Sequence, residues 1–192
     1  MATAAATRPA RSRHVPGEPG VWVLIFGDLV VFTVFFATYL HARASQPERF
    51  AAAQKALNPA YGVAYTLLLL TGSLFVATGV RAARRRAGSP APALFAGAFG
   101  CGLAFVALKS LEYHDKIAHG LTAGTNDFFL YFYILTGVHL FHVLIGLGVL
   151  IALVAKSRHQ PLPFRFLEGG ATFWHLVDLL WIVLFPLLYF VR

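Results

Sequence analysis

The chain has 192 residues, of which 58% are hydrophobic and only 12% are charged. A soluble domain carries about 25% charged residues, so this composition excludes an ordinary water-soluble enzyme. The net charge of +8 lies in tails and loops between apolar stretches, which indicates membrane topology and argues against nucleic-acid binding. The single cysteine, Cys101, excludes a disulfide framework or a cysteine-based zinc site.

Five apolar stretches follow one another along the chain, and each has the roughly 20 residues that cross about 30 Å of hydrocarbon. A membrane span must satisfy its own backbone polar groups, and these stretches lack the period-two alternation of barrel strands. The sequence therefore predicts an all-α polytopic membrane protein, a bundle of five transmembrane helices. The predicted spans are Gly20–Leu40, Ala60–Val80, Ala91–Ser110, Phe128–Ala155 and Ala171–Val191.

The first 19 residues contain three arginines and no apolar signal-peptide core. We predict a disordered basic tail over residues 1–19 and one transmembrane domain over residues 20–192, with the first span as an uncleaved anchor. With the amino end in the cytoplasm, ten Lys and Arg side chains lie on that side and six on the other. The positive-inside rule therefore predicts a cytoplasmic N-terminus and a C-terminus outside.

Several ionisable side chains lie inside the predicted spans, where each costs at least about 2.5–3.5 kcal/mol and so needs a partner. Asp28 lies about 12 Å into the first span. His139 and His142 share one helical face near the middle of the fourth span. In the fifth span His175 precedes Asp178 by one turn, and the predicted bounds put Asp178 near the same side of the membrane as Asp28.

Histidines on neighbouring spans could in principle bind haem or a metal. Bis-histidine haem ligation normally needs paired histidines at matched depths on two helices. The fourth span offers two central histidines, whereas the predicted bounds place His175 nearer the cytoplasmic end of the fifth. We therefore expect no haem or metal, and we expect the histidines to bond carboxylates or lipid headgroups within the bundle.

The stretch LEYHDKIAHG (111–120) is amphipathic and is predicted to extend the third helix beyond the membrane. Two partners are open to Glu112. It can pair with Lys116 one turn later at the solvated interface, or it can be buried against His139.

Four ordered motifs resemble subunit III of the haem–copper cytochrome oxidases. They are GVWVLIFGDLVVFTVFF (Gly20–Phe36), LEYHDKIAHG, FFLYFYILTGVHLFHVLIGLGVLIAL (Phe128–Leu153) and FWHLVDLLWIVLFPLLYF (Phe173–Phe190). The resemblance covers about Pro16 to Val191, and the chain is similar to the five-helix form of the family. The Gly27-Asp28 pair, the short loops and the EPGVW entry favour the NorE-type branch, which is associated with nitric oxide reductase.

The resemblance implies a non-redox accessory subunit that is not an enzyme by itself and has no cofactor. Its expected partners are phospholipid, held in a cleft between helices, and the catalytic haem–copper subunit of a nitric oxide reductase or a cytochrome or quinol oxidase. Support of proton uptake and of the durability of the catalytic core is a further expectation. The expected location is the bacterial cytoplasmic (inner) membrane.

The resemblance also selects a set of polar residues for the lipid cleft and the buried polar cluster, with no catalytic or metal-binding residue among them. Asp28 stands where most oxidase members have Glu, and the motif match predicts a contact between Asp28 and His142 that lines an internal cleft. The positions that match as they stand are Glu112, His139, His142, Glu168, His175, Asp178 and Trp181.

Two other functions are compatible with the polar residues in the spans. An independent proton- or ion-translocating protein could use Asp28, His142 and Asp178 as a relay, and a b-type cytochrome could use the histidines. Copurification with a catalytic subunit in gentle detergent distinguishes the accessory subunit from a transporter. A Soret band would identify a cytochrome.

Overall fold

The computed structural model describes residues 19–85, 89–158 and 164–191, and in these ranges it contains six helices and no strand. Five of the helices are long and apolar enough to cross a membrane, which confirms the predicted all-α fold with five spans. The predicted basic tail lies outside the described residues, apart from Pro19 at the start of the first helix. The helices are α1 (Pro19–Ser45), α2 (Pro47–Gln54), α3 (Pro59–Arg85), α4 (Ala91–Ala118), α5 (Asp127–Lys156) and α6 (Phe164–Tyr189).

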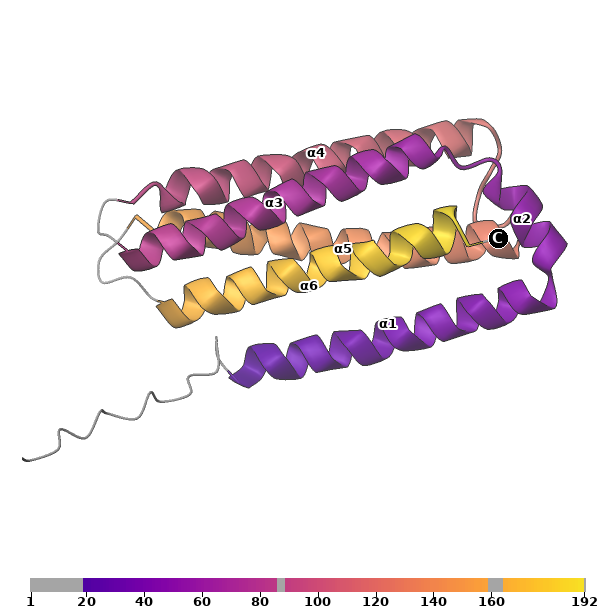
Figure 1. Cartoon of the computed structure of the whole chain (residues 1–192). Coiled ribbons are helices and arrows are strands. Elements are labelled where there is room, and N and C mark those ends of the chain that lie inside the picture. Colours follow the sequence, from indigo (N-terminus) through magenta and orange to yellow (C-terminus); the bar gives the residue numbers. More distant parts are fainter. Residues whose placement is uncertain (1–18, 86–88, 159–163, 192) are drawn as a thin grey trace, which may run out of the picture.

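Helices α3 to α6 pack as a four-helix bundle, and α1 lies along its edge against α5 and α6 (Figure 1). The short helix α2 turns the chain from α1 into α3. Helix α1 begins at the same end of the bundle as α6, which we call the amino-terminal end. In the most apolar segment of each helix, 11% of the residues are buried in α1 but 61% in α6. Helix α6 is therefore the central helix, and α1 is the most exposed one.

Trp174 anchors α6 in the middle of the bundle. Its side chain is fully buried and lies against one glycine from each of the other three bundle helices, Gly72 of α3, Gly102 of α4 and Gly146 of α5. Small residues allow membrane helices to approach closely. Here they make room for one large indole ring.

Hydroxyl groups on the outer faces of the helices are satisfied within their own helix. Thr33, Thr71, Thr78 and Ser110 each donate a hydrogen bond of 2.6–2.8 Å to the carbonyl oxygen four residues earlier. Water is absent from the bilayer core, so these bonds let hydroxyl side chains face lipid without an unpaired donor.

The structure corrects the predicted fifth span. Helix α6 begins at Phe164 rather than Ala171 and ends at Tyr189 rather than Val191. The prediction followed the apolar run alone, whereas the helix continues through the polar Glu168 and two glycines, of which Gly170 packs against Val149 and Leu153 of α5. Helix α2 was also not predicted.

The longer α6 moves two predicted site residues. Asp178 lies fourteen residues after Phe164, near the middle of the helix rather than near its start. Asp28 lies at a similar level, because its partner His142 stands between His139 and Gly146, which contact Trp181 and Trp174 on either side of Asp178. His175 is likewise central, so unequal histidine depth does not exclude haem, and the surroundings of each histidine must decide.

Candidate functional site

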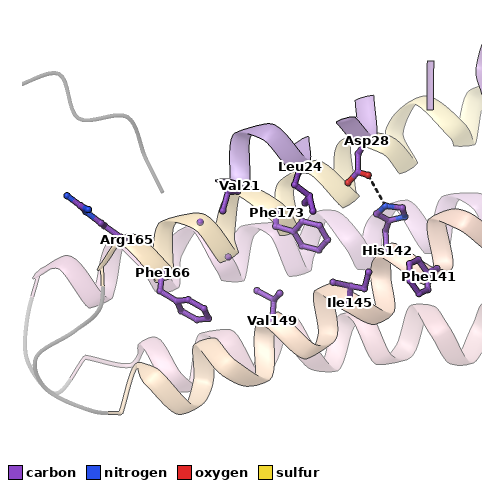
Figure 2. Close-up of a pocket in the computed structure, with 12 residues that line it drawn as sticks. Val21, Leu24, Asp28, Phe141, His142, Ile145, Val149, Arg165, Phe166 and Phe173 are labelled. Carbon is purple, nitrogen blue, oxygen red and sulfur yellow. Dashed lines mark ion pairs between the residues drawn. The ribbon is translucent and has the colours of Figure 1, made fainter. Parts of the chain in front are cut away.

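A cleft of about 510 Å³ separates the first half of α1 from α5 and α6 (Figure 2). Its walls are mostly apolar and aromatic, with two polar groups near one end and a cation at the other. Cavities of this size and composition are typical of sites for small apolar molecules. The lining residues are Val21, Leu24, Asp28, Phe141, His142, Ile145, Val149, Arg165, Phe166, Gly169, Gly170 and Phe173.

The polar end of the cleft is formed by Asp28 of α1 and His142 of α5. Asp28 Oδ1 lies 3.3 Å from His142 Nε2, and the two side chains are only 21% and 13% exposed. The predicted contact between Asp28 and His142 is therefore present, and both residues line the cleft. Phe32 packs edge-on against the imidazole ring.

The second ring nitrogen of His142 fixes the orientation of the imidazole ring. His142 Nδ1 lies 2.8 Å from the carbonyl oxygen of Val138, which can only accept, so Nδ1 donates to it. Nε2 is therefore the ring nitrogen that faces Asp28.

The opposite end of the cleft is cationic. Arg165 lies in the first turn of α6 and lines the opening. Nearby, the ammonium group of Lys156 lies 4.8 Å from the centre of the Phe166 ring, which also lines the cleft. Along α6, Phe173 lies eight residues after Arg165, about 12 Å further along the helix, and the Asp28–His142 pair lies beyond Phe173 (Figure 2).

A second polar site is enclosed in the bundle near its other end. Lys109 Nζ lies 2.7 Å from Glu112 Oε2, and neither side chain has any exposed surface. Tyr65 donates to the same carboxylate oxygen at 3.1 Å, and Tyr189 donates to Oε1 at 2.9 Å. This buried cluster joins α3, α4 and the end of α6 through one carboxylate.

Aromatic rings complete the surroundings of Lys109. Its ammonium group lies 4.6 Å from the ring centre of Phe132, and the rings of Tyr65, Tyr113 and Trp181 lie within 5.2–5.7 Å. Ring faces attract a cation, and the effect grows where water is excluded. The predicted site residue Trp181 therefore serves as a wall of this cage, and its indole nitrogen donates to Thr66.

Both predicted partners of Glu112 are wrong. The carboxylate pairs with Lys109, while Lys116 bonds Asp115 at 3.3 Å. His139 is completely buried between the rings of Phe105 and Trp181, and neither of its ring nitrogens has a hydrogen-bond partner. The expectation that His139 bonds a carboxylate or a headgroup is therefore also wrong.

The other predicted site residues do not join the cleft. His175 Nδ1 lies 2.6 Å from Ser73 Oγ, on the side of α6 that faces α3, and Asp178 is buried in the same part of the bundle. In the part of the chain that the structure describes, no ion pair or hydrogen bond links Asp178 to His142. The suggested relay through Asp28, His142 and Asp178 is therefore not continuous.

Glu168 lies in the first turns of α6 and forms an ion pair with Arg84 at the end of α3. The carboxylate side chain is 9% exposed and the guanidinium side chain 55%. This contact joins the two helices at the amino-terminal end and allows α6 to begin before its apolar run.

Lys109, Tyr65 and Tyr189 are not among the predicted site residues. Lys109 is one of the six cations that the sequence assigns to the outer side of the membrane. A usable signal was present, because Lys109 and Glu112 are three residues apart and both lie at the inward-facing end of an otherwise apolar helix face. The two tyrosines could not be assigned, because they come from other helices.

Over residues 19–85, 89–158 and 164–191, no three His, Cys, Asp or Glu side chains gather as a metal site would require. The fold and the two polar sites define a multi-pass helical membrane protein whose cleft is mostly apolar. The sequence profile described as "Cytochrome c oxidase subunit III" matches residues 16–192. The chain belongs to the cytochrome c oxidase subunit III family.

Named relatives agree with this assignment. A probable cytochrome c oxidase subunit 3 of Mycobacterium leprae is 32% identical over 180 residues, covering 90% of this chain and 87% of the relative. The cytochrome c oxidase subunit 3 of a Synechocystis species is 29% identical over 98% of this chain and 87% of its own length. The cytochrome bo(3) ubiquinol oxidase subunit 3 of Pseudomonas aeruginosa is 28% identical, over 88% of this chain and 82% of its own.

Proposed function

We propose that this protein is a non-redox accessory subunit of a respiratory haem–copper oxidoreductase in the bacterial cytoplasmic membrane. The observation that carries the proposal is the cleft between α1 and the bundle, in a chain that belongs to the subunit III family. The cleft offers an apolar wall, the polar Asp28–His142 pair and a cationic opening. Such a site suits the retention of a lipid and the support of a partner.

The occupant that the opening favours is an anionic phospholipid. Arg165 and Lys156 lie where a phosphate group would sit, and a guanidinium group can bind phosphate through two parallel hydrogen bonds. Acyl chains would then lie against the apolar side chains of α1, α5 and α6. Replacing Arg165 and Lys156 with glutamine should reduce the anionic phospholipid that copurifies, as measured by native mass spectrometry.

The orientation that we propose has the amino-terminal end of the bundle in the cytoplasm. Lys109 is buried inside the bundle, so it does not add a positive charge to the outer side of the membrane. The excess of Lys and Arg on the cytoplasmic side is therefore larger than the sequence count alone indicates. The cleft would then open toward the cytoplasmic leaflet, whose surface is rich in anionic lipid. In that position the Asp28–His142 pair would support proton uptake by the partner.

The catalytic partner that we propose is a haem–copper subunit. The Gly27-Asp28 pair favours the NorE-type branch and hence nitric oxide reductase, whereas the relatives compared above are named as oxidase subunits. Purification in gentle detergent with an affinity tag on this chain would identify the partner from its haem spectrum and its reduction of nitric oxide or oxygen. Isolation of this chain alone, with proton flux in proteoliposomes, would overturn the accessory role.

Deletion of the gene tests the role itself. We expect the haem spectrum of the partner to be unchanged while its activity declines faster during prolonged turnover. Activity that decays at the same rate with and without this chain, at equal pH and lipid content, would contradict the proposal.

A further inference from the structure

A phospholipid accounts for the opening of the cleft but not for its deep end. With the phosphate at Arg165, the part of the lipid that lies more than about 12 Å deeper is acyl chain. Methylene groups offer nothing to a polar pair, and burying a polar atom without a partner costs free energy. Asp28 and His142 nevertheless lie at that depth on the wall of the cleft.

The hydrogen-bonding character of this deep end follows from the atoms already engaged. Both ring nitrogens of His142 are occupied, Nδ1 by Val138 and Nε2 by Asp28. The remaining polar atom is Asp28 Oδ2, which makes no hydrogen bond to the described residues. Oδ2 is therefore the atom of this pair that is open to a ligand, and a carboxylate oxygen accepts hydrogen bonds.

We infer that the deep end of the cleft binds an apolar molecule of the bilayer through a hydroxyl group, which donates a hydrogen bond to Asp28 Oδ2. Aromatic side chains that line the cleft, Phe141 and Phe173 among them (Figure 2), suit a ring or a hydrocarbon body. Two kinds of membrane molecule carry this chemistry, a phenolic hydroquinone and a diacylglycerol. A molecule with acceptors alone has no partner there.

Each source can be tested with a pair of probes that differ only in the O–H group. Decylhydroquinone, kept reduced without oxygen, is compared with its dimethyl ether, and dioleoylglycerol is compared with its acetate ester. Binding to the purified chain in phosphatidylcholine nanodiscs is measured as saturable uptake above that of empty nanodiscs. We expect at least one hydroxyl form to bind about tenfold more tightly than its capped partner, the effect of one hydrogen bond of about 1.4 kcal/mol.

Variants at position 28 locate the effect. Asp28→Leu removes the acceptor, so the preference for the hydroxyl form should fall to about onefold. Asp28→Asn should keep it, because the amide nitrogen can donate to His142 Nε2 while the amide oxygen faces the cleft. Val30→Leu, on the exposed side of α1, is the matched control and should bind like the unaltered chain.

The source is identified by which pair shows the preference, and either pair supports the inference. Equal binding of free and capped probes in the unaltered protein would overturn it, and that comparison does not require any variant to fold. A preference that persists in Asp28→Leu would also overturn it. So would nanodiscs in which only phospholipid is retained and neither hydroxyl probe binds saturably.

Discussion

A methyl group placed on Gly102 of α4 would lie 2.8 Å from the indole ring of Trp174 of α6. The corresponding distance at Gly146 of α5 is 3.0 Å. Carbon atoms do not approach to 2.8 Å, so either the indole ring or the α4 backbone would have to move. Trp174 therefore dictates glycine in the helices that surround it.

Gly102→Ala and Gly146→Ala are expected to destabilise the bundle by about 1–3 kcal/mol, the usual cost of overpacking a core. Unfolding in mixed detergent micelles, followed by circular dichroism, measures the change. Gly100→Ala and Gly137→Ala are matched controls, since nothing lies within 4 Å of the added methyl group. These controls should be neutral or slightly stabilising, because alanine favours helix over glycine. Equal loss in all four variants would contradict the packing argument.

Lys109→Met should destabilise the protein by about 3–5 kcal/mol, because it leaves the Glu112 carboxylate buried without its cation. Adding Glu112→Gln should cost less than the sum of the two single changes, and the difference measures their coupling. The matched control is Lys116→Met on the same helix. Its partner Asp115 is 49% exposed, and the loss should stay below about 1 kcal/mol. Additive single effects would show that Lys109 and Glu112 act independently.

The purified chain is expected to contain neither haem nor copper in stoichiometric amount. In the described ranges no three His, Cys, Asp or Glu side chains gather as a metal site requires, and the ring of His139 is enclosed by those of Phe105 and Trp181. An optical spectrum and elemental analysis of the protein, separated from its partner, provide the measurement. One iron or copper per chain would contradict the accessory role.

The proposed orientation predicts which loops a membrane-impermeant thiol reagent can reach. In a Cys101→Ala background, Ala123→Cys in the loop between α4 and α5 should be labelled in intact spheroplasts. Ser157→Cys, at the end of α5, should be labelled only after the membrane is opened. The reverse pattern would show that the amino end lies outside.

Much of the fold was predictable because hydrocarbon thickness limits the length of a span and leaves the helix as the available conformation. The helix ends were less predictable at α6, where the ion pair of Glu168 with Arg84 extends a helix beyond its apolar run. Such a contact depends on which helices are neighbours. Hydropathy alone does not contain that information.

The contacts of the candidate site were also predictable only in part. Asp28 and His142 could be paired because motif positions fixed which spans face each other. Glu112 was given the wrong partner, since its true surroundings are assembled from Tyr65, Lys109 and Tyr189, which come from three helices. His139 was expected to bond a polar group because that is usual for a buried histidine. In the structure two rings enclose it instead.

The place of α1 at the edge of the bundle has a consequence for biosynthesis. Its neighbours within the membrane, α5 and α6, leave the ribosome after α2, α3 and α4. Until they emerge, Asp28 lacks its histidine and the membrane-facing side of α1 has lipid around it. A mean hydropathy of 2.2, above the 1.8–1.9 of α3, α4 and α6, suits α1 to that stage. Helix α1 is thus synthesised before the helices on which it docks, and the cleft forms only after α6 has emerged.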